Sequence, residues 1–205
     1  MDKFKNTHRI PSSRLQSWDY GAPGLYFISI CTKNREQYFG KIENCEMFLN
    51  ELGLIVNKEW IKTPLIRRDM NLELGEFITM PNHFHAIIMI GENKYNSQLP
   101  RGGVICGNAV GRDAMHGVST TTTTDAVPTT NQKIPNKFGP QSKNLASIVR
   151  GFKSSVTTQS KKINIEFGWQ ARFHDHIIRS HDELFRISSY IINNPDNWKE
   201  DKFFN

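Results

Sequence analysis

Strand-like runs rich in apolar and β-branched residues occur at about residues 25–32, 72–80 and 83–90, and the first of them alternates in side-chain type. Alternation with a period of two is typical of β-strands, because successive side chains point to opposite faces of a sheet. Only Pro81-Asn82 separates the second stretch from the third, and this dipeptide favours a tight turn. The last two stretches are therefore predicted to pair as a hairpin.

Three other segments carry apolar residues at helical spacing. The first runs from about residue 42 to 62, and Pro64 is expected to end it. The second begins at Leu145 and has one apolar stripe, formed by Leu145, Ile148, Val149, Phe152 and Val156. The third follows Ser180-His-Asp-Glu183, which resembles a capping box, and Pro195 is expected to close it.

Residues 169–178 form a fourth strand-like stretch. The resulting order is strand, helix, strand, strand, helix, strand and a final helix, which is the α+β ferredoxin-like (split βαβ) arrangement. We expect an antiparallel sheet with helices on one face, plus a C-terminal helix, in a single domain spanning residues 1–205. Residues 91 to about 140 contain Gly102-Gly103, a run of threonines and few large apolar residues. That segment is predicted to be a flexible insertion.

Charge and cysteine content narrow the function classes. Lys and Arg outnumber Asp and Glu by 26 to 20, for a formal net charge of +6, which favours an anionic partner such as nucleic acid. The three cysteines have neither zinc-like spacing nor the pattern of a disulfide framework. No apolar stretch resembles a signal peptide or a membrane span. A cytoplasmic location without membrane association is expected.

The histidine pair His83-x-His85 lies inside the apolar stretch at residues 83–90. In a strand the two imidazoles share one face with Ile87 and Met89. Two polar rings on a mostly buried strand are costly unless something binds them. A divalent metal is the obvious candidate, and a hydrogen-bonded pair in the core is the alternative.

The final helix carries a candidate nucleophile. Arg186, Tyr190 and Asn194 are spaced i, i+4, i+8 and share one helix face. A phenol with an ordinary pKa of about 10 needs a nearby cation or base to attack at neutral pH. Asn194 can offer its amide oxygen to the metal held by His83 and His85. In the simpler interpretation Tyr190 is a packing residue and Asn194 only ends the helix.

Five segments, in this order, resemble the HUH-type single-tyrosine transposases, and specifically the REP-associated tyrosine transposases. Together they span nearly all of the chain outside residues 91–140. They are Tyr26-Phe-Ile-Ser-Ile-Cys-Thr-Lys-Asn-Arg35, Met80-Pro-Asn-His-Phe-His85, Leu145-Ala-Ser-Ile-Val-Arg-Gly-Phe-Lys153, Trp169-Gln-Ala-Arg-Phe-His-Asp-His-Ile-Ile-Arg179 and Tyr190-Ile-Ile-Asn-Asn-Pro195.

The resemblance implies a metal-dependent transposase that binds hairpin-containing single-stranded DNA. Such an enzyme cleaves and rejoins the strand through a covalent 5′-phosphotyrosine intermediate. His83 and His85 match the HUH metal ligands, Tyr190 matches the nucleophile, and Asn194 stands where the family places a polar third ligand. The implied ion is Mg²⁺ or Mn²⁺, although two imidazoles also accept zinc. The segment at residues 91–140 departs from the compact members of the family.

Other residues are candidates for DNA contacts. Trp169 and Phe173 can stack on unpaired bases, although both types more often pack in a core. His174-Asp-His176 is a second His-x-His that can bind metal or DNA, or simply form a polar strand edge. Five basic residues are candidates for phosphate contacts: Arg150, Lys153, Arg172, Arg179 and Arg186.

Two other functions stay open. One is a catalytically inactive DNA hairpin-binding protein, which the presence of His83, His85 and Tyr190 together disfavours. The other is an HUH relaxase or replication-initiator-like nickase, which the short chain and the absence of a helicase or primase region disfavour. The sequence also leaves open whether the protein acts as a monomer or a homodimer.

Overall fold

The computed structural model describes residues 3–4, 7–8, 14–15, 18–97, 142–163 and 166–204. The chain divides into two units, and the one formed by Asp19–Ile105 and Gln141–Asn205 contains every element of the site. In the other unit, β1 (Lys3–Phe4) pairs with β2 (Thr7–His8). Of the predicted insertion, residues 91–97 form a turn and the rest lies outside the described residues.

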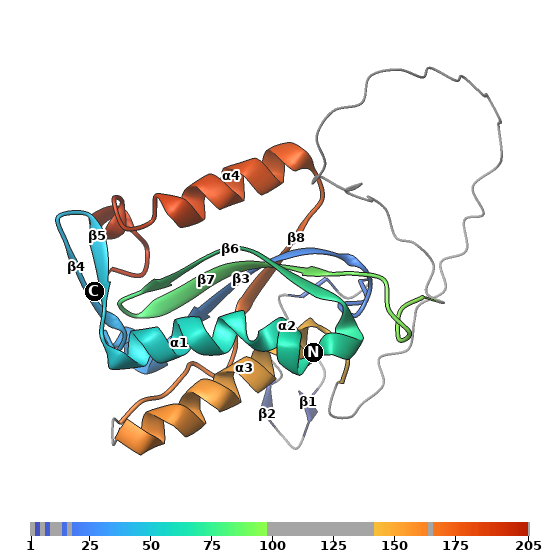
Figure 1. The fold of residues 1–205 in the computed structure, drawn as a ribbon, viewed down its shortest axis with the longest axis horizontal. Coiled ribbons are helices and arrows are strands. Elements are labelled where there is room, and N and C mark those ends of the chain that lie inside the picture. The colour runs from blue at the N-terminus through green and yellow to red at the C-terminus, as the bar shows by residue number, and fades with distance from the viewer. Residues whose placement is uncertain are drawn as a thin grey trace. The chain divides into compact units, whose positions relative to one another are not determined.

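The second unit is built on a four-stranded antiparallel sheet (Figure 1). Its strands are ordered β6-β7-β3-β8, and they are β3 (Gly24–Cys31), β6 (Leu72–Met80), β7 (His83–Ile90) and β8 (His174–Ile178). A helix follows β3 and another follows β7. This order and connectivity confirm the predicted ferredoxin-like fold.

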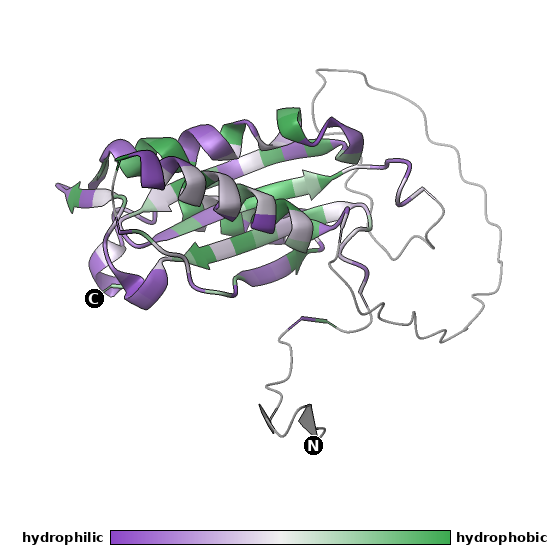
Figure 2. Ribbon diagram, turned by 90° about the horizontal axis from the view of Figure 1, so that it is seen from below, coloured by the Kyte–Doolittle hydropathy of each residue, from purple (hydrophilic) through white to green (hydrophobic). Residues whose placement is uncertain are grey.

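Helices cover both faces of the sheet (Figure 1). Helices α1 (Glu51–Ile61) and α3 (Leu145–Ser160) lie on one face and contact each other, whereas α4 (His181–Ile192) lies on the other. Figure 2, seen from the side of α1 and α3, shows largely apolar strands and many hydrophilic residues on the helices. The shorter elements are α2 (Thr63–Ile66), η1 (Lys33–Arg35), η2 (Arg68–Met70), η3 (Lys161–Ile163) and η4 (Trp198–Glu200).

The apolar stripe predicted for α3 is buried along its whole length. Its Phe152 packs on Trp60 of α1 and on Phe84 of β7, with ring centroids 5.1 and 5.2 Å away. Edge-to-face and tilted aromatic pairs of this kind add to the gain from burying their apolar area. The side chains of β7 that point to this face therefore form the larger core.

The other face of β7 carries the histidines. Ile87 is buried there against Ile187 and Ile191 of α4 and Ile178 of β8. His83 and His85 share this face because they precede Ile87 at intervals of two residues. The packing of α4 on the sheet thus encloses the two imidazoles.

The helix predicted over residues 42–62 is wrong in its first half. Strands β4 (Gly40–Glu43) and β5 (Glu46–Leu49) form a hairpin there, and its turn residues Asn44 and Cys45 have φ values of 51° and 64°. Two successive residues with positive φ are what a tight two-residue hairpin turn requires. The apolar residues of this stretch fit both helical and strand spacing, so periodicity alone misassigned it.

The true start of α1 follows from local capping. Asn50 caps the helix, because its side chain accepts a hydrogen bond of 2.9 Å from the Gly53 amide. Pro64 lies in the first turn of α2, where proline is tolerated.

The fourth strand is shorter than predicted. Trp169 forms only an isolated bridge with Thr32, and regular pairing begins at His174. The Trp169 ring instead packs on Phe39 and Phe167, with centroids 5.4 and 5.0 Å away. Among the residues of the described segments, no helix combines the length and the apolar character needed to cross a membrane.

Candidate active site

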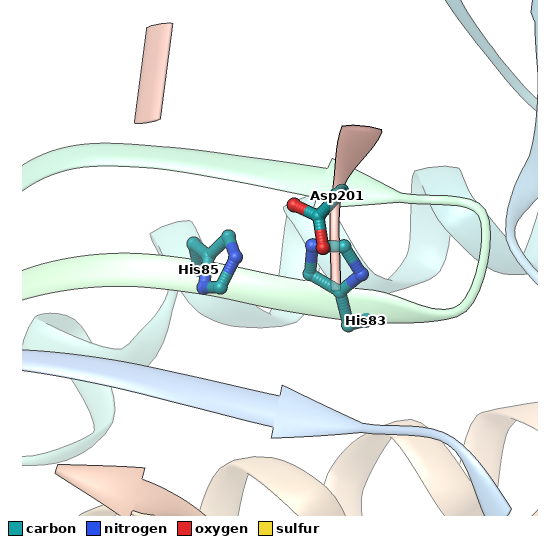
Figure 3. Close-up of side chains that lie close together, drawn as sticks. All are labelled: His83, His85 and Asp201. Atoms are coloured by element: carbon teal, nitrogen blue, oxygen red, sulfur yellow. The ribbon is translucent and has the colours of Figure 1, made fainter. Parts of the chain in front are cut away.

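The two histidines lie side by side on β7 (Figure 3), and both are buried. His83 is 0% and His85 1% exposed, and their ring centroids are 4.4 Å apart. β7 is an interior strand, paired to β6 on one side and to β3 on the other. Two adjacent imidazoles are thereby held on a rigid element.

Helix α4 brings Tyr190 to this pair. The Tyr190 phenolic oxygen lies 3.2 Å from Nε2 of His85. Phe27 of β3 stacks on His85 and meets the edge of Tyr190, with centroids 5.3 and 6.3 Å away. Tyr190 remains 40% exposed, so its side chain is only partly covered.

Asn194, the predicted third ligand, is also brought to the site. Its side chain is 1% exposed, and its Nδ2 donates to Oδ2 of Asp201 at 3.2 Å. The same carboxylate oxygen lies 3.4 Å from the Tyr190 hydroxyl. Ligand atoms of His83, His85 and Asp201 all lie within 4.8 Å of one another (Figure 3).

Asp201 was not predicted from the sequence. The C-terminal segment folds back over the histidines because its aromatic residues pack there: the rings of Trp198 and Phe203 lie 5.9 and 4.6 Å from that of His83. The three large aromatic residues after Pro195 were the available signal, because such side chains need a surface to pack on.

Each imidazole is held at Nδ1 by a neighbouring side chain. Nδ1 of His85 lies 2.7 Å from Oγ of Ser29 on β3, and Nδ1 of His83 lies 2.9 Å from Oδ1 of Asn82. Hydrogen bonds of this kind at one ring nitrogen orient the other nitrogen toward a metal. Neither Ser29 nor Asn82 was predicted from the sequence to be part of the site.

Burial sets the charge state of the site. It lowers the pKa of His83 to about 4 and holds the pKa of His85 well below its usual value, where His83 also opposes protonation. Burial, together with the Asp201 carboxylate, raises the pKa of Tyr190 to about 12. At neutral pH the site therefore has two neutral imidazoles and a protonated phenol.

Two buried polar atoms in the site are without a hydrogen-bond partner among the described residues. They are Nε2 of His83 and Oδ1 of Asn194. An unsatisfied buried polar atom costs roughly 1–3 kcal/mol, and a bound cation would satisfy both. Two neutral imidazoles and a carboxylate form a donor set suited to a divalent metal. The cluster can therefore hold such an ion, but its geometry does not select one.

The predicted phosphate-binding residues do not gather at the histidines. Arg150 and Lys153 lie on α3, on the opposite side of the sheet, and line a cavity of about 200 Å³ with Phe173. Arg172 is exposed. Arg179 and Arg186 flank the Glu183 carboxylate, which accepts the Arg179 backbone N–H at 2.9 Å and lies 3.9 Å from the Arg186 guanidinium.

Two other cations lie nearer the histidines. The charges of Arg35 and Lys202 both act on His83. They flank the Phe203 ring, with the charged groups 5.4 and 4.9 Å from its centroid. These two residues, which the sequence analysis did not single out, make the rim of the site positive.

The second His-x-His pair, His174 and His176, lies on the same face of the sheet as the site. It is not part of the cluster formed by His83, His85 and Asp201. Pairing of β3 with β8 puts His174 opposite Ser29 and His176 opposite Phe27. Nε2 of His176 contacts the Glu183 carboxylate at 2.6 Å. His176 thus joins β8 to the start of α4, as expected for a polar strand edge.

Comparisons with known proteins give one close relative. A Haemophilus influenzae protein described as uncharacterized is 34% identical over 199 residues, covering 96% of this chain and 94% of its own. The chain belongs to the same family as that protein. No family model matches the chain.

The comparisons also include a solved structure, that of a REP-associated tyrosine transposase bound to a REP hairpin. It has a TM-score of 0.49 and 16% sequence identity, over 96% of this chain and 77% of that one.

Proposed function

We propose that this protein is a metal-dependent transposase and endonuclease of the HUH single-tyrosine type. It binds single-stranded DNA with hairpins and cleaves and rejoins it through a covalent 5′-phosphotyrosine. The observation that carries this proposal is the contact of 3.2 Å between Tyr190 and His85 inside a cluster that can hold a metal. The ordered motifs of the chain, which resemble those of REP-associated tyrosine transposases, support the same function.

His83, His85 and Asp201 would hold Mg²⁺ or Mn²⁺, with Asn194 beside them as a further oxygen donor. A bound divalent ion neutralises the charge that develops on a phosphate as it is attacked. Tyr190 is the only described side chain of the site with a hydroxyl that is both close to the cluster and exposed. It is therefore the nucleophile.

The proposed reaction needs no external energy source, because each bond that breaks is replaced by one that forms. The Tyr190 oxygen forms a bond to phosphorus and the bond from phosphorus to the 3′ oxygen breaks. The phenolic proton is lost and the departing 3′ oxygen gains one. Attack by a 3′ hydroxyl on the phosphotyrosine reverses these steps, so one site both cuts and rejoins.

The test is a denaturant-resistant adduct with labelled single-stranded hairpins in Mn²⁺. Wild-type protein should form it, and Tyr190→Phe should abolish it while hairpin affinity stays within about twofold, because only the attacking oxygen is removed. Tyr95→Phe is the matched control, since Tyr95 is 41% exposed and hydrogen-bonds to Asp69 away from the site. EDTA should stop cleavage, and Mn²⁺ or Mg²⁺ should restore it.

An adduct formed by the Tyr190→Phe variant would show that another residue attacks. A wild-type protein that binds hairpins without forming any adduct would instead be a catalytically inactive binding protein. Cleavage that survives thorough chelation would remove the metal from the mechanism.

A further inference from the structure

We propose that Asn82 is a positioning residue that aligns two metal ligands at once. One end of its amide fixes the tautomer of His83, and the other end anchors the segment that carries Asp201. This inference rests on the proposed function, because His83 and Asp201 matter together only if both bind the ion.

The orientation of the Asn82 amide is determined by its neighbours. Its Nδ2 lies 2.7 Å from the backbone oxygen of Phe203 and 3.1 Å from that of Arg35. Both neighbours are acceptors only, so the amide nitrogen must face them and the amide oxygen must face away. That oxygen lies 2.9 Å from Nδ1 of His83.

The tautomer of His83 follows. An amide oxygen accepts hydrogen bonds and cannot donate, so Nδ1 of His83 carries the proton. A neutral imidazole has one proton on its ring nitrogens, which leaves Nε2 of His83 as a bare lone pair. This atom is buried and, among the residues that the structure describes, has no hydrogen-bond partner, as an atom prepared for a cation would be.

The same side chain holds the C-terminal segment. Phe203, which accepts from Asn82, donates its own backbone N–H to Oδ1 of Asp201 at 2.7 Å. That bond occupies one carboxylate oxygen, and the other, Oδ2, is left facing Tyr190 and Asn194. Hydrogen bonds therefore connect His83 to Asp201 through the Asn82 side chain and the Phe203 backbone.

Asparagine is the side chain that meets both demands here. Asn82 is 0% exposed, so its hydrogen bonds are made away from bulk solvent. Aspartate at this position would keep an acceptor for His83 but lose both donated bonds. Alanine would lose all three. The two substitutions therefore separate the tautomer of His83 from the anchoring of the C-terminal segment that carries Asp201, called the tail below.

The experiment compares wild type, Asn82→Ala and Asn82→Asp in the full-length protein. Asn96→Ala is the matched control, since Asn96 is a second buried asparagine that bridges the loops at Gly21 and Gly91 away from the site. The first readout is the tautomer of His83, from ¹⁵N chemical shifts without metal or DNA. The second is the rate of trypsin cleavage after Lys202, followed by mass spectrometry. The third is Mn²⁺ affinity by calorimetry.

Wild type should show the proton on Nδ1 of His83. Asn82→Asp should keep that tautomer yet increase cleavage after Lys202 about 5–30-fold, because the tail loses its anchor. Asn82→Ala should lose the single tautomer, release the tail and weaken Mn²⁺ binding about 10–100-fold. Asn96→Ala should change none of the three readouts.

A proton on Nε2 of His83 in the wild type would overturn the proposal without any variant. A folded Asn82→Ala protein that keeps the Mn²⁺ affinity of the wild type and its resistance to cleavage after Lys202 would also overturn the proposal. The tautomer and the tail are measured without DNA, so failure of the proposed function, seen as a missing DNA adduct, is a separate result.

Discussion

The phenolic oxygen of Tyr190 and Nε2 of His85 are 3.2 Å apart. Nδ1 of His85 is occupied by Ser29, so Nε2 is the nitrogen that would coordinate a cation, and the phenol and an ion would compete for the same atom. Burial and Asp201 raise the pKa of Tyr190 to about 12, which makes the free phenol a poor nucleophile. Activation therefore depends on what binds at the cluster.

The roles of Asp201 and Asn194 can be separated by substitution. We expect Asp201→Asn to weaken Mn²⁺ binding by at least about tenfold, because it replaces a charged ligand, and outer hydrogen-bonding partners alone are worth about 10–100-fold. Asn194→Ala should have the smaller effect. Calorimetric titration with Mn²⁺ measures both. The reverse order would make Asn194 the third ligand, as the family resemblance implies.

Phosphate contacts at Arg150 and Lys153 predict a particular salt dependence. Replacing either with Gln should weaken binding of a single-stranded hairpin and reduce the slope of log K against log salt by about 1. Fluorescence anisotropy over a range of NaCl concentrations gives the slope. Lys41→Gln is the control, since the Lys41 side chain is 69% exposed and paired with Glu43. An unchanged slope in both α3 variants would place the DNA elsewhere.

The buried Glu59 carboxylate should make stability depend on pH. Burial opposes its charge, but hydrogen bonds from Lys62 and Ser155 outweigh this and lower the pKa of Glu59. A lowered folded-state pKa stabilises the protein above the unfolded value, about 4.3 for Glu, and this stability is lost as pH falls through the folded pKa. Glu59→Gln should therefore cost about 1 kcal/mol at pH 7.

The cost of Glu59→Gln should shrink as the pH falls below about 4, as measured by urea unfolding at each pH. The exposed pair of Lys41 and Glu43 provides the comparison, and Glu43→Gln should change little at any pH. A cost for Glu59→Gln that stays constant with pH would show that the effect is one of packing.

Packing of α4 should control the position of Tyr190. Ile191 is 1% exposed, so Ile191→Ala should lower the free energy of unfolding by about 2–5 kcal/mol. It should also slow adduct formation, because the helix that carries Tyr190 loses contacts with the sheet. Phe185 on the same helix is 70% exposed, and Phe185→Ala should stay within about 0.5 kcal/mol of wild type. Equal losses of activity in the two variants would contradict this dependence.

The spacing of apolar residues was enough to predict those helices and strands whose sequence fits only one type of secondary structure. The hairpin of β6 and β7 and the start of α3 appear at the predicted residues, because long apolar repeats with clear turn or capping residues leave little ambiguity. The helix predicted at residues 42–49 was wrong, because the apolar spacing there fits both a helix and a strand. The positive φ of Asn44 and Cys45 decides between the two.

The sequence by itself also placed His83 and His85 on one face of a strand and pointed to Tyr190 and Asn194. Spacing within one element is enough for such an inference, since the backbone fixes which side chains share a face. The roles of Asp201 and Asn82 could not be predicted from the sequence. Their roles arise where the C-terminal segment folds onto the β6–β7 turn, and contacts between segments far apart in the chain depend on packing that no local pattern records.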